Sequence, residues 1–321
     1  MSVYTPVTRE QLEDFLRTYP CGELLSFQGI SAGIENTNYF VTTSEGEYVL
    51  TLFEMLTKSE LPYFLNLMAY LAEHDVKSAH PIADQDGVYL RELEGKPTAL
   101  VQRLNGRSVE APEAEHCFQV GSALAKIHVL SDGFSRQREN ERGAGWWADM
   151  QKKLLPHLNE QNSALLKDEM EEQSKCRYEG LPRGITHADL FRDNVLFDGP
   201  NLSGMIDFYY ACTGVFLYDV AVTVNDWCSA EDGSLDEVRF AAMLAGYQTQ
   251  RSFVDVESEA WPVMLRAAGL RFWLSRLHDK HFQREGEMTH IKDPDVFMQI
   301  IRHHRDNRDE IIKQWRSALV G

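Results

Sequence analysis

The sequence predicts an α+β fold, with a small antiparallel sheet in an N-terminal lobe and a larger, mostly helical C-terminal lobe. Up to residue 104, short runs rich in β-branched and aromatic residues alternate with turn residues, and one helical pattern interrupts them. From residue 105 onward, apolar residues recur mainly at helical spacing. We therefore expect two domains, residues 1–104 and residues 105–321, joined near the segment QRLNGR at 102–107.

The N-terminal lobe is expected to begin with a helix and to continue as a sheet. Thr8 and Gln11 have the spacing of a capping box, which predicts a short helix over 9–19. Apolar residues recur every three or four positions between 59 and 75, which predicts a second helix with one buried face. The predicted strands are 24–31, 37–43, 47–54, 87–93 and 98–104.

Helices dominate the predicted C-terminal lobe. The helical stretches are 113–130, two segments between 145 and 178, 217–228, 235–248, 259–280 and 294–315, whereas 131–144 has no clear pattern. One β element lies among them, because two apolar runs flank Gly199, Pro200 and Asn201. A hairpin turn centred on Pro200–Asn201 would place Asn194 opposite Asp207 at its open end.

The composition limits the classes of function. The chain has 321 residues, a formal net charge of −17 and a pI near 5.1, and a field of that sign repels nucleic acid. No apolar stretch reaches the roughly 18 residues of a membrane span, and the N-terminus has no signal-peptide pattern. The five cysteines are scattered and odd in number, which favours small buried side chains in a reducing compartment. We expect a cytoplasmic protein, and both a monomer and a homodimer fit the sequence.

A polar segment, HADLFRDN at 187–194, precedes the hairpin and suggests an active site. Asp189 and Asn194, together with Asp207 beyond the hairpin, are residue types that suit phosphoryl transfer to a hydroxyl. Asn194 and Asp207 offer hard oxygen ligands for Mg²⁺, and Asp189 would orient the acceptor hydroxyl and take its proton. His187 has no evident task in such a transfer, so we expect its ring nitrogens to bond the backbone and shape the loop.

The segments HADLFRDNVLF and MIDF resemble the catalytic region of the aminoglycoside phosphotransferase and choline kinase superfamily, which has a protein-kinase-like fold. The resemblance implies that ATP is the phosphate donor, that Asp189 is the catalytic base, and that Asn194 and Asp207 hold Mg²⁺. It also implies that Asp219, in the segment LYDVA, is the structural aspartate that braces the catalytic loop.

A closer resemblance within this superfamily is to the bacterial homoserine kinases that use the fold. The similar segments include GIENTNYFVTT, EYVLTLFE, IDFYYACTG, LYDVAVTVNDWC and LRFWLSRLHD, which are spread over nearly the whole chain. The resemblance implies ATP-dependent O-phosphorylation of L-homoserine for threonine synthesis. Choline, ethanolamine and an aminoglycoside are alternative acceptors, and a nucleotide-binding pseudokinase is an alternative function.

Nucleotide binding is expected in the N-terminal lobe. A loop over the phosphates would combine small residues, which let backbone N–H groups approach oxygen, with side-chain donors. The segment LVQRL resembles the hinge that bonds adenine through backbone atoms. The residues suggested for these contacts are Ser31, Asn36, Thr37, Asn38, Thr51, Gln102 and Leu104.

Thr51 is a departure from the kinase pattern, because kinase folds usually have a lysine in this strand that binds the α- and β-phosphates. A lysine–phosphate contact at about 4 Å is worth roughly 4 kcal/mol at an effective dielectric constant near 20. We expect another cation to replace it, and Lys58 and Arg91 are candidates by position. The missing lysine motivates the pseudokinase alternative, whereas the complete catalytic segment argues against it.

The acceptor must be bound as a zwitterion if it is homoserine. Its carboxylate then requires an Arg or Lys, and its ammonium requires carboxylate or amide oxygens. The candidates for these contacts are Arg192, Asp226, Trp227 and Arg271. Arg192 has a second interpretation, in which it pairs with Asp193 or with the backbone. His128 lies on an otherwise apolar helical face and is expected to be a core histidine rather than a ligand.

Overall fold

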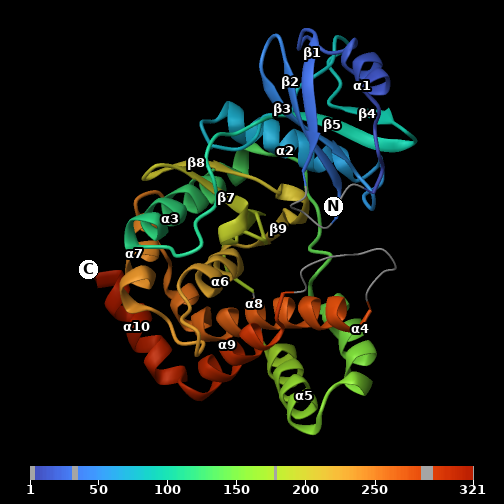
Figure 1. Cartoon of the computed structure of the whole chain (residues 1–321). Helices are drawn as coiled ribbons and strands as arrows, with labels where there is room; N and C mark the ends of the chain where they lie inside the picture. Colours follow the sequence, from blue (N-terminus) through green and yellow to red (C-terminus); the bar gives the residue numbers. More distant parts are fainter. Residues whose placement is uncertain (1–3, 31–34, 177–178, 283–291, 321) are drawn as a thin grey trace. The chain divides into compact units, whose positions relative to one another are not determined.

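The computed structural model describes residues 4–30, 35–176, 179–282 and 292–320. The chain divides into two compact units (Figure 1). The first unit holds the described residues up to Asn105, and the second holds those from Gly106 onward. The α+β class predicted from the sequence is confirmed, since an antiparallel sheet forms the first unit and helices dominate the second.

The first unit is a five-stranded antiparallel sheet with two helices, in the strand order β1-β2-β3-β5-β4. Its elements are α1 (Arg9–Leu16), β1 (Leu24–Gly29), β2 (Thr37–Thr43), β3 (Glu47–Leu52), α2 (Leu61–Glu73), β4 (Leu90–Leu93) and β5 (Lys96–Gln102). The predicted capping box of α1 is confirmed, because Thr8 and Gln11 each accept the other's backbone N–H through a side-chain oxygen. Leu12 of α1 and Leu50 of β3 belong to the core that joins helix and sheet.

Strand β4 is shorter than the predicted run 87–93. The Asp84 carboxylate accepts the backbone N–H groups of Asp86 and Val88 at 3.0 and 2.8 Å. This turn, with Gly87 at a φ of 78°, keeps the chain out of the sheet until Leu90. Hydrogen bonds from a short acidic side chain thus compete with strand pairing here.

Eight α-helices belong to the described part of the second unit. They are α3 (Ala114–Val129), α4 (Ala144–Leu154), α5 (Glu160–Lys175), α6 (Phe216–Trp227), α7 (Glu237–Gln248), α8 (Asp255–His281), α9 (Asp295–Asp306) and α10 (Arg308–Val320). The predicted helix 294–315 is two helices, because the chain turns at Asn307. Helix α6 is central to the unit, since eleven of its twelve residues are buried.

Two pairs of short strands frame the segment 187–194. Strand β6 (Arg183–Thr186) pairs with β9 (Cys212–Val215), and β7 (Val195–Asp198) pairs with β8 (Asn201–Met205). The β7–β8 hairpin is predicted from the turn residues between its two runs, whereas β6 and β9 are not predicted, because they are far apart in sequence and no turn signal joins them.

The register of the hairpin differs from the predicted one. Asp198 pairs with Asn201, so the turn is the Gly-Pro dipeptide between them. Its glycine has a φ of 58°, as the first position of a type II′ turn requires. A register shift, in which Ser203 is the extra residue in β8, then brings Asn194 opposite Ile206, whose N–H donates to the Asn194 carbonyl at 3.0 Å. Asp207 therefore lies one residue beyond the position predicted for it.

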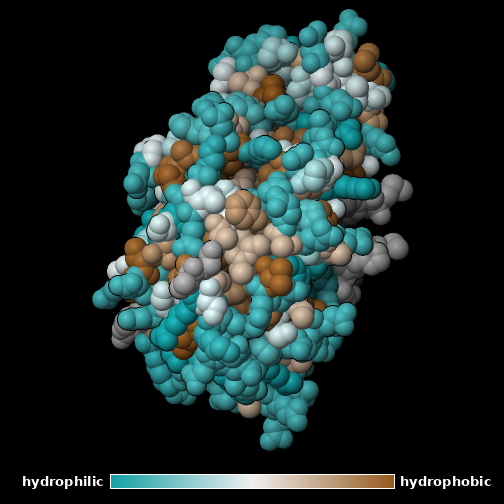
Figure 2. Space-filling view, turned by 90° about the vertical axis from the view of Figure 1, so that its left-hand side faces the viewer, coloured by the Kyte–Doolittle hydropathy of each residue, from teal (hydrophilic) through white to brown (hydrophobic). Residues whose placement is uncertain are grey.

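The surface has no dominant apolar region on the face in Figure 2, where hydrophilic residues predominate and hydrophobic ones form small groups. The exposed large hydrophobic side chains come from many elements and include Leu25, Met55, Val129, Val238 and Val296. Among the described residues, no helix is both long enough and apolar enough to cross a membrane.

Helices α3 and α7 approach so closely that both need glycine at the contact. A Cβ at Gly121 of α3 would lie 2.1 Å from the Met243 carbonyl oxygen, and a Cβ at Gly246 of α7 would lie 1.9 Å from the Phe118 carbonyl oxygen. Both obstacles are backbone atoms in closely packed helices, so neither can move without separating the pair.

Alanine at either glycine should therefore destabilise the protein. We expect Gly121→Ala and Gly246→Ala each to lower the free energy of unfolding by about 2–3 kcal/mol, measured by urea denaturation. Gly145→Ala in α4 is the matched control, since open space surrounds that position. It should leave stability unchanged or raise it by up to about 1 kcal/mol through helix propensity. Wild-type stability of Gly121→Ala would contradict the packing described.

Candidate active site

The segment 187–194 forms a loop whose two ends are held by strands, and it is termed the 187–194 loop from here on. Strand β6 ends at Thr186 and β7 begins at Val195, so both anchors adjoin the loop directly. Helix α6 supplies three further side chains that bond to the loop.

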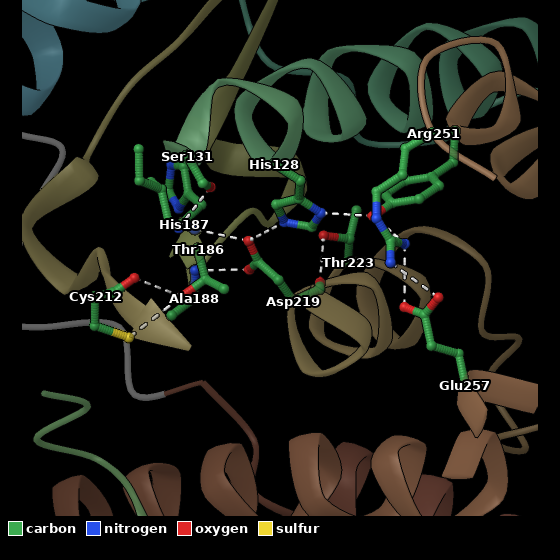
Figure 3. Close-up of polar contacts among 12 residues, drawn as sticks. His128, Ser131, Thr186, His187, Ala188, Cys212, Asp219, Thr223, Arg251 and Glu257 are labelled. Carbon is green, nitrogen blue, oxygen red and sulfur yellow. Dashed lines mark hydrogen bonds and ion pairs between the residues drawn. The ribbon is translucent and has the colours of Figure 1, made fainter. Parts of the chain in front are cut away.

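Asp219, in the first turn of α6, holds the beginning of the loop. Its carboxylate accepts the backbone N–H groups of His187 and Ala188, each at 2.7 Å (Figure 3). Ala188 has a φ of 62°, a left-handed conformation that costs an L-residue roughly 1–2 kcal/mol. Hydrogen bonds to a charged acceptor are about twice as strong as neutral ones and offset this strain. The conformation that precedes Asp189 is thus fixed from outside the loop.

The other end of α6 holds the remainder of the loop. Asp226 accepts the backbone N–H of Arg192 at 2.7 Å and the Nε of its guanidinium at 3.1 Å. The indole N–H of Trp227 donates to the Leu190 carbonyl at 3.0 Å. Residues seven or eight positions apart lie on one face of a helix, so α6 contacts the start, middle and end of the loop with a single face.

These contacts alter the interpretation of three residues suggested for acceptor binding. Trp227 is fully buried, and Asp226 and Arg192 form an ion pair with each other. Arg192 Nη1 also donates to the Glu110 carbonyl at 2.9 Å. Pairing within the protein therefore describes Arg192 better than acceptor binding does, although its partner is Asp226 and not Asp193.

Asp189 and Asn194 lie together inside the loop. Asn194 Nδ2 donates to the Asp189 carbonyl at 2.8 Å and to its carboxylate Oδ2 at 3.2 Å. The Asp189 side chain is 18% exposed, which leaves it accessible to a small molecule. Asn194 Oδ1 accepts no hydrogen bond from the described residues, so the amide oxygen is available to a cation.

Asp207 follows β8 and is exposed. Its backbone is left-handed, with a φ of 63° and a ψ of 55°, a conformation that aspartate tolerates better than most residues. Because Ile206 faces Asn194 in the hairpin, Asp207 emerges next to the asparagine. An amide oxygen and a carboxylate are the kinds of ligand that suit Mg²⁺, which keeps several of its waters when bound.

Two buried histidines adjoin Asp219. Burial lowers the pKa of His187 and of His128, against the opposing charge of Asp219, so both rings are neutral near pH 7. His187 stacks on Phe208, with 4.5 Å between ring centroids, and its Nε2 bonds the Ile206 carbonyl at 3.1 Å. One ring nitrogen thus bonds the backbone as predicted, whereas the buried Nδ1 has no partner among the described residues.

A chain of polar contacts continues from Asp219 into the core (Figure 3). His128 Nε2 lies 3.1 Å from Asp219 Oδ2, and its Nδ1 lies 2.7 Å from the Tyr247 hydroxyl. Arg251 donates to that hydroxyl at 3.2 Å and pairs with Glu257 at 3.0 Å. A guanidinium only donates and a carboxylate only accepts, so the donors point from Arg251 toward Asp219. His128 is therefore a satisfied core histidine, as predicted, with its proton on Nε2.

In the first unit, several residues suggested for nucleotide binding bond to one another. The Thr51 hydroxyl donates to Asn38 Oδ1 at 2.7 Å across the β2–β3 pair. The Thr37 hydroxyl donates to Glu54 at 2.8 Å, and Asn36 Oδ1 accepts the Glu54 N–H at 3.4 Å. These side chains thus gather at one end of β2 and β3.

Of the two residues suggested for the hinge, one has backbone groups available to a ligand and the other does not. Ser31 lies outside the described residues. The Gln102 N–H donates to the His80 carbonyl at 2.8 Å, so it is not available to adenine. The backbone of Leu104 has no hydrogen bond to another described residue, which leaves both of its polar groups available.

The cations suggested as replacements for the missing lysine are engaged elsewhere. Lys58 forms an ion pair with Glu92, and Arg91 forms ion pairs with Asp84 and Asp86. The Lys58 ammonium and the Arg91 guanidinium are therefore both paired with carboxylates, and neither takes the place of a lysine at Thr51.

Arg271 of α8 is the acceptor candidate that lies beside Asp189. Its Nη1 is 3.8 Å from Asp189 Oδ1, and the residue is only 5% exposed. The second unit thus brings together Asp189, Asn194 and Arg271, with Asp207 close to the asparagine in sequence and in the hairpin.

Comparison with known proteins gives consistent results. The model of the phosphotransferase enzyme family matches residues 26–253. The chain is 48% identical over 318 residues to the homoserine kinase of Methylobacillus flagellatus, which covers 99% of this chain and 100% of that protein. It is 46% identical over 301 residues to the homoserine kinase of Neisseria meningitidis, which covers 94% of this chain and 99% of that one.

Solved structures share the fold at low sequence identity. An amicoumacin kinase in complex with AMP-PNP and Ca²⁺ has a TM-score of 0.70 at 14% identity, over 95% of this chain and 94% of that one. A choline kinase from Cryptosporidium parvum has a TM-score of 0.65 at 13% identity, over 96% and 97% of the two chains. The protein-kinase-like fold predicted from the sequence is confirmed.

Asparagine in place of Asp219 should destabilise the protein. The two carboxylate oxygens of Asp219 accept three hydrogen bonds, from two backbone N–H groups and from the His128 ring. An asparagine side chain has one oxygen and one NH₂ group, so its NH₂ group would face at least one of these three donors. We expect Asp219→Asn to lower the free energy of unfolding by about 2–4 kcal/mol in urea denaturation. Asp198→Asn, at the exposed hairpin turn, should change it by less than about 0.5 kcal/mol. Equal stabilities for the two variants would contradict this role of Asp219.

Proposed function

This chain belongs to the phosphotransferase enzyme family, and we propose that it transfers the γ-phosphoryl group of ATP to the hydroxyl of L-homoserine, forming O-phospho-L-homoserine. It is a small-molecule kinase. The observation that supports this acceptor is the identity of 43–48% to homoserine kinases over most of the chain. The alternative acceptors choline, ethanolamine and aminoglycosides are supported only through the fold, because those structures share 13–17% identity with this chain.

Asp189 is the proposed general base. Its carboxylate is partly exposed, and Asn194 holds one of its two oxygens, Oδ2, at 3.2 Å. The other oxygen, Oδ1, can then accept a hydrogen bond from the acceptor hydroxyl and remove its proton as the phosphoryl group is transferred. In such a transfer the protein contributes mainly positioning and charge, so a rigidly held base is an advantage.

Asn194 and Asp207 are the proposed magnesium ligands. The amide oxygen of Asn194 and the exposed carboxylate of Asp207 fit a hard cation. When bound, Mg²⁺ supplies positive charge to the oxygens of the nucleotide phosphates. The amide hydrogens of Asn194 remain directed at Asp189, so this residue would connect the metal ligands to the base.

The first unit is the proposed nucleotide-binding domain, with adenine near Leu104 and the phosphates near Asn36, Thr37 and Asn38. The free backbone groups of Leu104 support the first contact. The Thr51 hydroxyl bonds to Asn38 and so orders a polar side chain where other kinases have lysine. The absence of that lysine does not favour a pseudokinase here, because the residues proposed as the base and as the two metal ligands are all retained.

We also propose that the enzyme acts in the cytoplasm. All five cysteines are free, as expected in a reducing compartment. Four of them are buried as predicted, and Cys176 is the exception because it is only partly buried at the end of α5.

The choice of acceptor can be tested directly. With ATP and Mg²⁺, we expect the wild-type enzyme to release ADP in proportion to O-phosphohomoserine formed, with kcat/KM at least about 100-fold higher for L-homoserine than for choline, ethanolamine or kanamycin. The measurement is a coupled ADP assay with mass spectrometry of the product. Faster turnover of any of those three would refute homoserine as the acceptor, and absence of all turnover with intact ATP binding would favour the pseudokinase.

Asp189→Asn tests the general base. The variant retains the hydrogen-bonding shape but cannot accept a proton, so kcat should fall at least about 1,000-fold while ATP–Mg²⁺ affinity, measured by calorimetry, changes less than about threefold. Asp198→Asn serves as the matched control and should keep full activity. If Asp189→Asn retained wild-type kcat, the assignment of the base would be wrong.

A further inference from the structure

Arg271 is a buried guanidinium without a hydrogen-bond acceptor among the described residues. It is 5% exposed, and its single ionic contact in the described part of the chain is Asp189 Oδ1 at 3.8 Å. That distance is beyond hydrogen-bonding range. The five N–H donors of this largely buried side chain thus have no oxygen among the described residues to receive them, and a small oxyanion that reached them would supply the missing acceptor.

Two other arginines of the same unit show how this chain satisfies a largely buried guanidinium. Arg266 donates to Glu169 Oε2 through two nitrogens, at 2.9 and 2.6 Å. Arg251 donates to both oxygens of Glu257, at 3.1 and 3.0 Å. Both have side chains that are 13% exposed, against 6% for Arg271. Arg271 is more buried than either, and among the described residues it has no carboxylate within hydrogen-bonding distance.

The surroundings of Arg271 hold it in place without using its donors. The guanidinium carbon lies 4.9 Å from the ring centre of Tyr210 and 3.9 Å from that of Phe272. Aromatic rings stabilise a cation through their faces, and a guanidinium so packed still has N–H groups available in its own plane. A planar oxyanion is the ligand that this geometry accepts best.

The position relative to Asp189 distinguishes an acceptor from a nucleotide. Asn194, a proposed magnesium ligand, contacts Oδ2 of Asp189, whereas Arg271 approaches Oδ1. Asn194 and Arg271 thus lie beside different carboxylate oxygens of the proposed base. The phosphates would lie with the metal ligands, so an anion on Arg271 belongs to the molecule whose hydroxyl reaches Oδ1.

We propose that Arg271 binds the α-carboxylate of the acceptor and thereby selects hydroxy amino acids over amino alcohols. The proposal rests on the kinase activity proposed above and identifies the residue that gives it specificity. In homoserine, four bonds of about 1.5 Å each separate the hydroxyl oxygen from the carboxylate carbon, a span of roughly 5 Å when extended. A molecule of that length can reach Asp189 and Arg271 together, because the two side chains are 3.8 Å apart.

The charge of Arg271 also explains which acceptors would be disfavoured. Choline, ethanolamine and aminoglycosides are cations without a carboxylate, so a buried guanidinium beside the base would repel them. Tyr218 of α6 offers a second donor in the same region. Burial raises the pKa of its hydroxyl, with Arg271 and Asp189 among the charges that act on it, so the hydroxyl stays protonated.

The test compares two acceptors that differ only in the carboxylate, L-homoserine and 3-amino-1-propanol. In Arg271→Leu, kcat/KM for homoserine should fall at least about 100-fold, while kcat/KM for 3-amino-1-propanol should change less than about threefold or rise. Arg271→Lys should recover part of the homoserine activity, since it restores the charge but not the bidentate geometry. Arg302→Leu, which removes an arginine from α9, is the control and should alter neither value.

Two further readouts separate acceptor binding from a structural role. Calorimetry with AMP-PNP and Mg²⁺ present should show homoserine affinity lost in Arg271→Leu and unchanged nucleotide affinity. The melting temperature should be unchanged or higher, because a buried cation without a partner is replaced by an apolar side chain. A fall in melting temperature with intact homoserine binding would overturn the proposal.

Equal losses for the two acceptors in Arg271→Leu would also overturn it, because Arg271 would then act on Asp189 or on the transferred phosphoryl group. A wild-type enzyme that phosphorylates 3-amino-1-propanol but not homoserine would instead refute the proposed function itself. The two failures are therefore distinguishable by the behaviour of the wild type alone.

Discussion

The site depends on how helix α6 holds the 187–194 loop. The helix is buried along almost its whole length, so it cannot shift without repacking the unit. Asp219 bonds the start of the loop, Trp227 its middle and Asp226 its end. At 1.5 Å per residue, the seven residues from Asp219 to Asp226 span about 10.5 Å. A loop of eight residues is thereby fixed by one rigid element, and Asp189, the proposed base, is held as rigidly as the loop.

The bonds between helix and loop are mutually necessary. A buried carboxylate such as Asp219 is tolerated only when donors surround it, and the loop provides two backbone N–H groups that would otherwise lack partners. His128 supplies the third donor and links Asp219, through Tyr247 and Arg251, to Glu257 in the first turn of α8. Helix α8 also carries Arg271, whose guanidinium lies beside Asp189. Contacts at two points of α8 therefore link this helix to the loop.

Local patterns in the sequence were sufficient to predict part of this arrangement. The spacing of Asp189 and Asn194 and the apolar runs of the hairpin indicate a candidate catalytic segment, and its motifs correctly indicate homoserine kinases as the similar family. The exact pairing of the hairpin could not be predicted, because the extra residue in β8 that places Asn194 opposite Ile206 has no sequence signature.

Other features depend on contacts distant in sequence. The partner of His128 lies 91 residues away, and the burial of Arg271 follows from rings on two different elements. From the sequence, Asp226 and Trp227 are expected to bind the acceptor, whereas in the structure both side chains bond to the loop. Asp226 and Trp227 follow Asp219 by seven and eight residues, which places all three on one face of a helix. This spacing is the feature of the sequence that indicates a shared role in holding the loop.

Native-state amide hydrogen exchange tests the role of α6 most directly. If the helix holds the loop, the amide protons of His187, Ala188 and Arg192, which bond to side chains of α6, should exchange only through openings nearly as costly as global unfolding. They should then be as protected as the amides of α6 itself. Exchange of these three amides at the rates of an unstructured loop, with α6 still fully protected, would contradict the account.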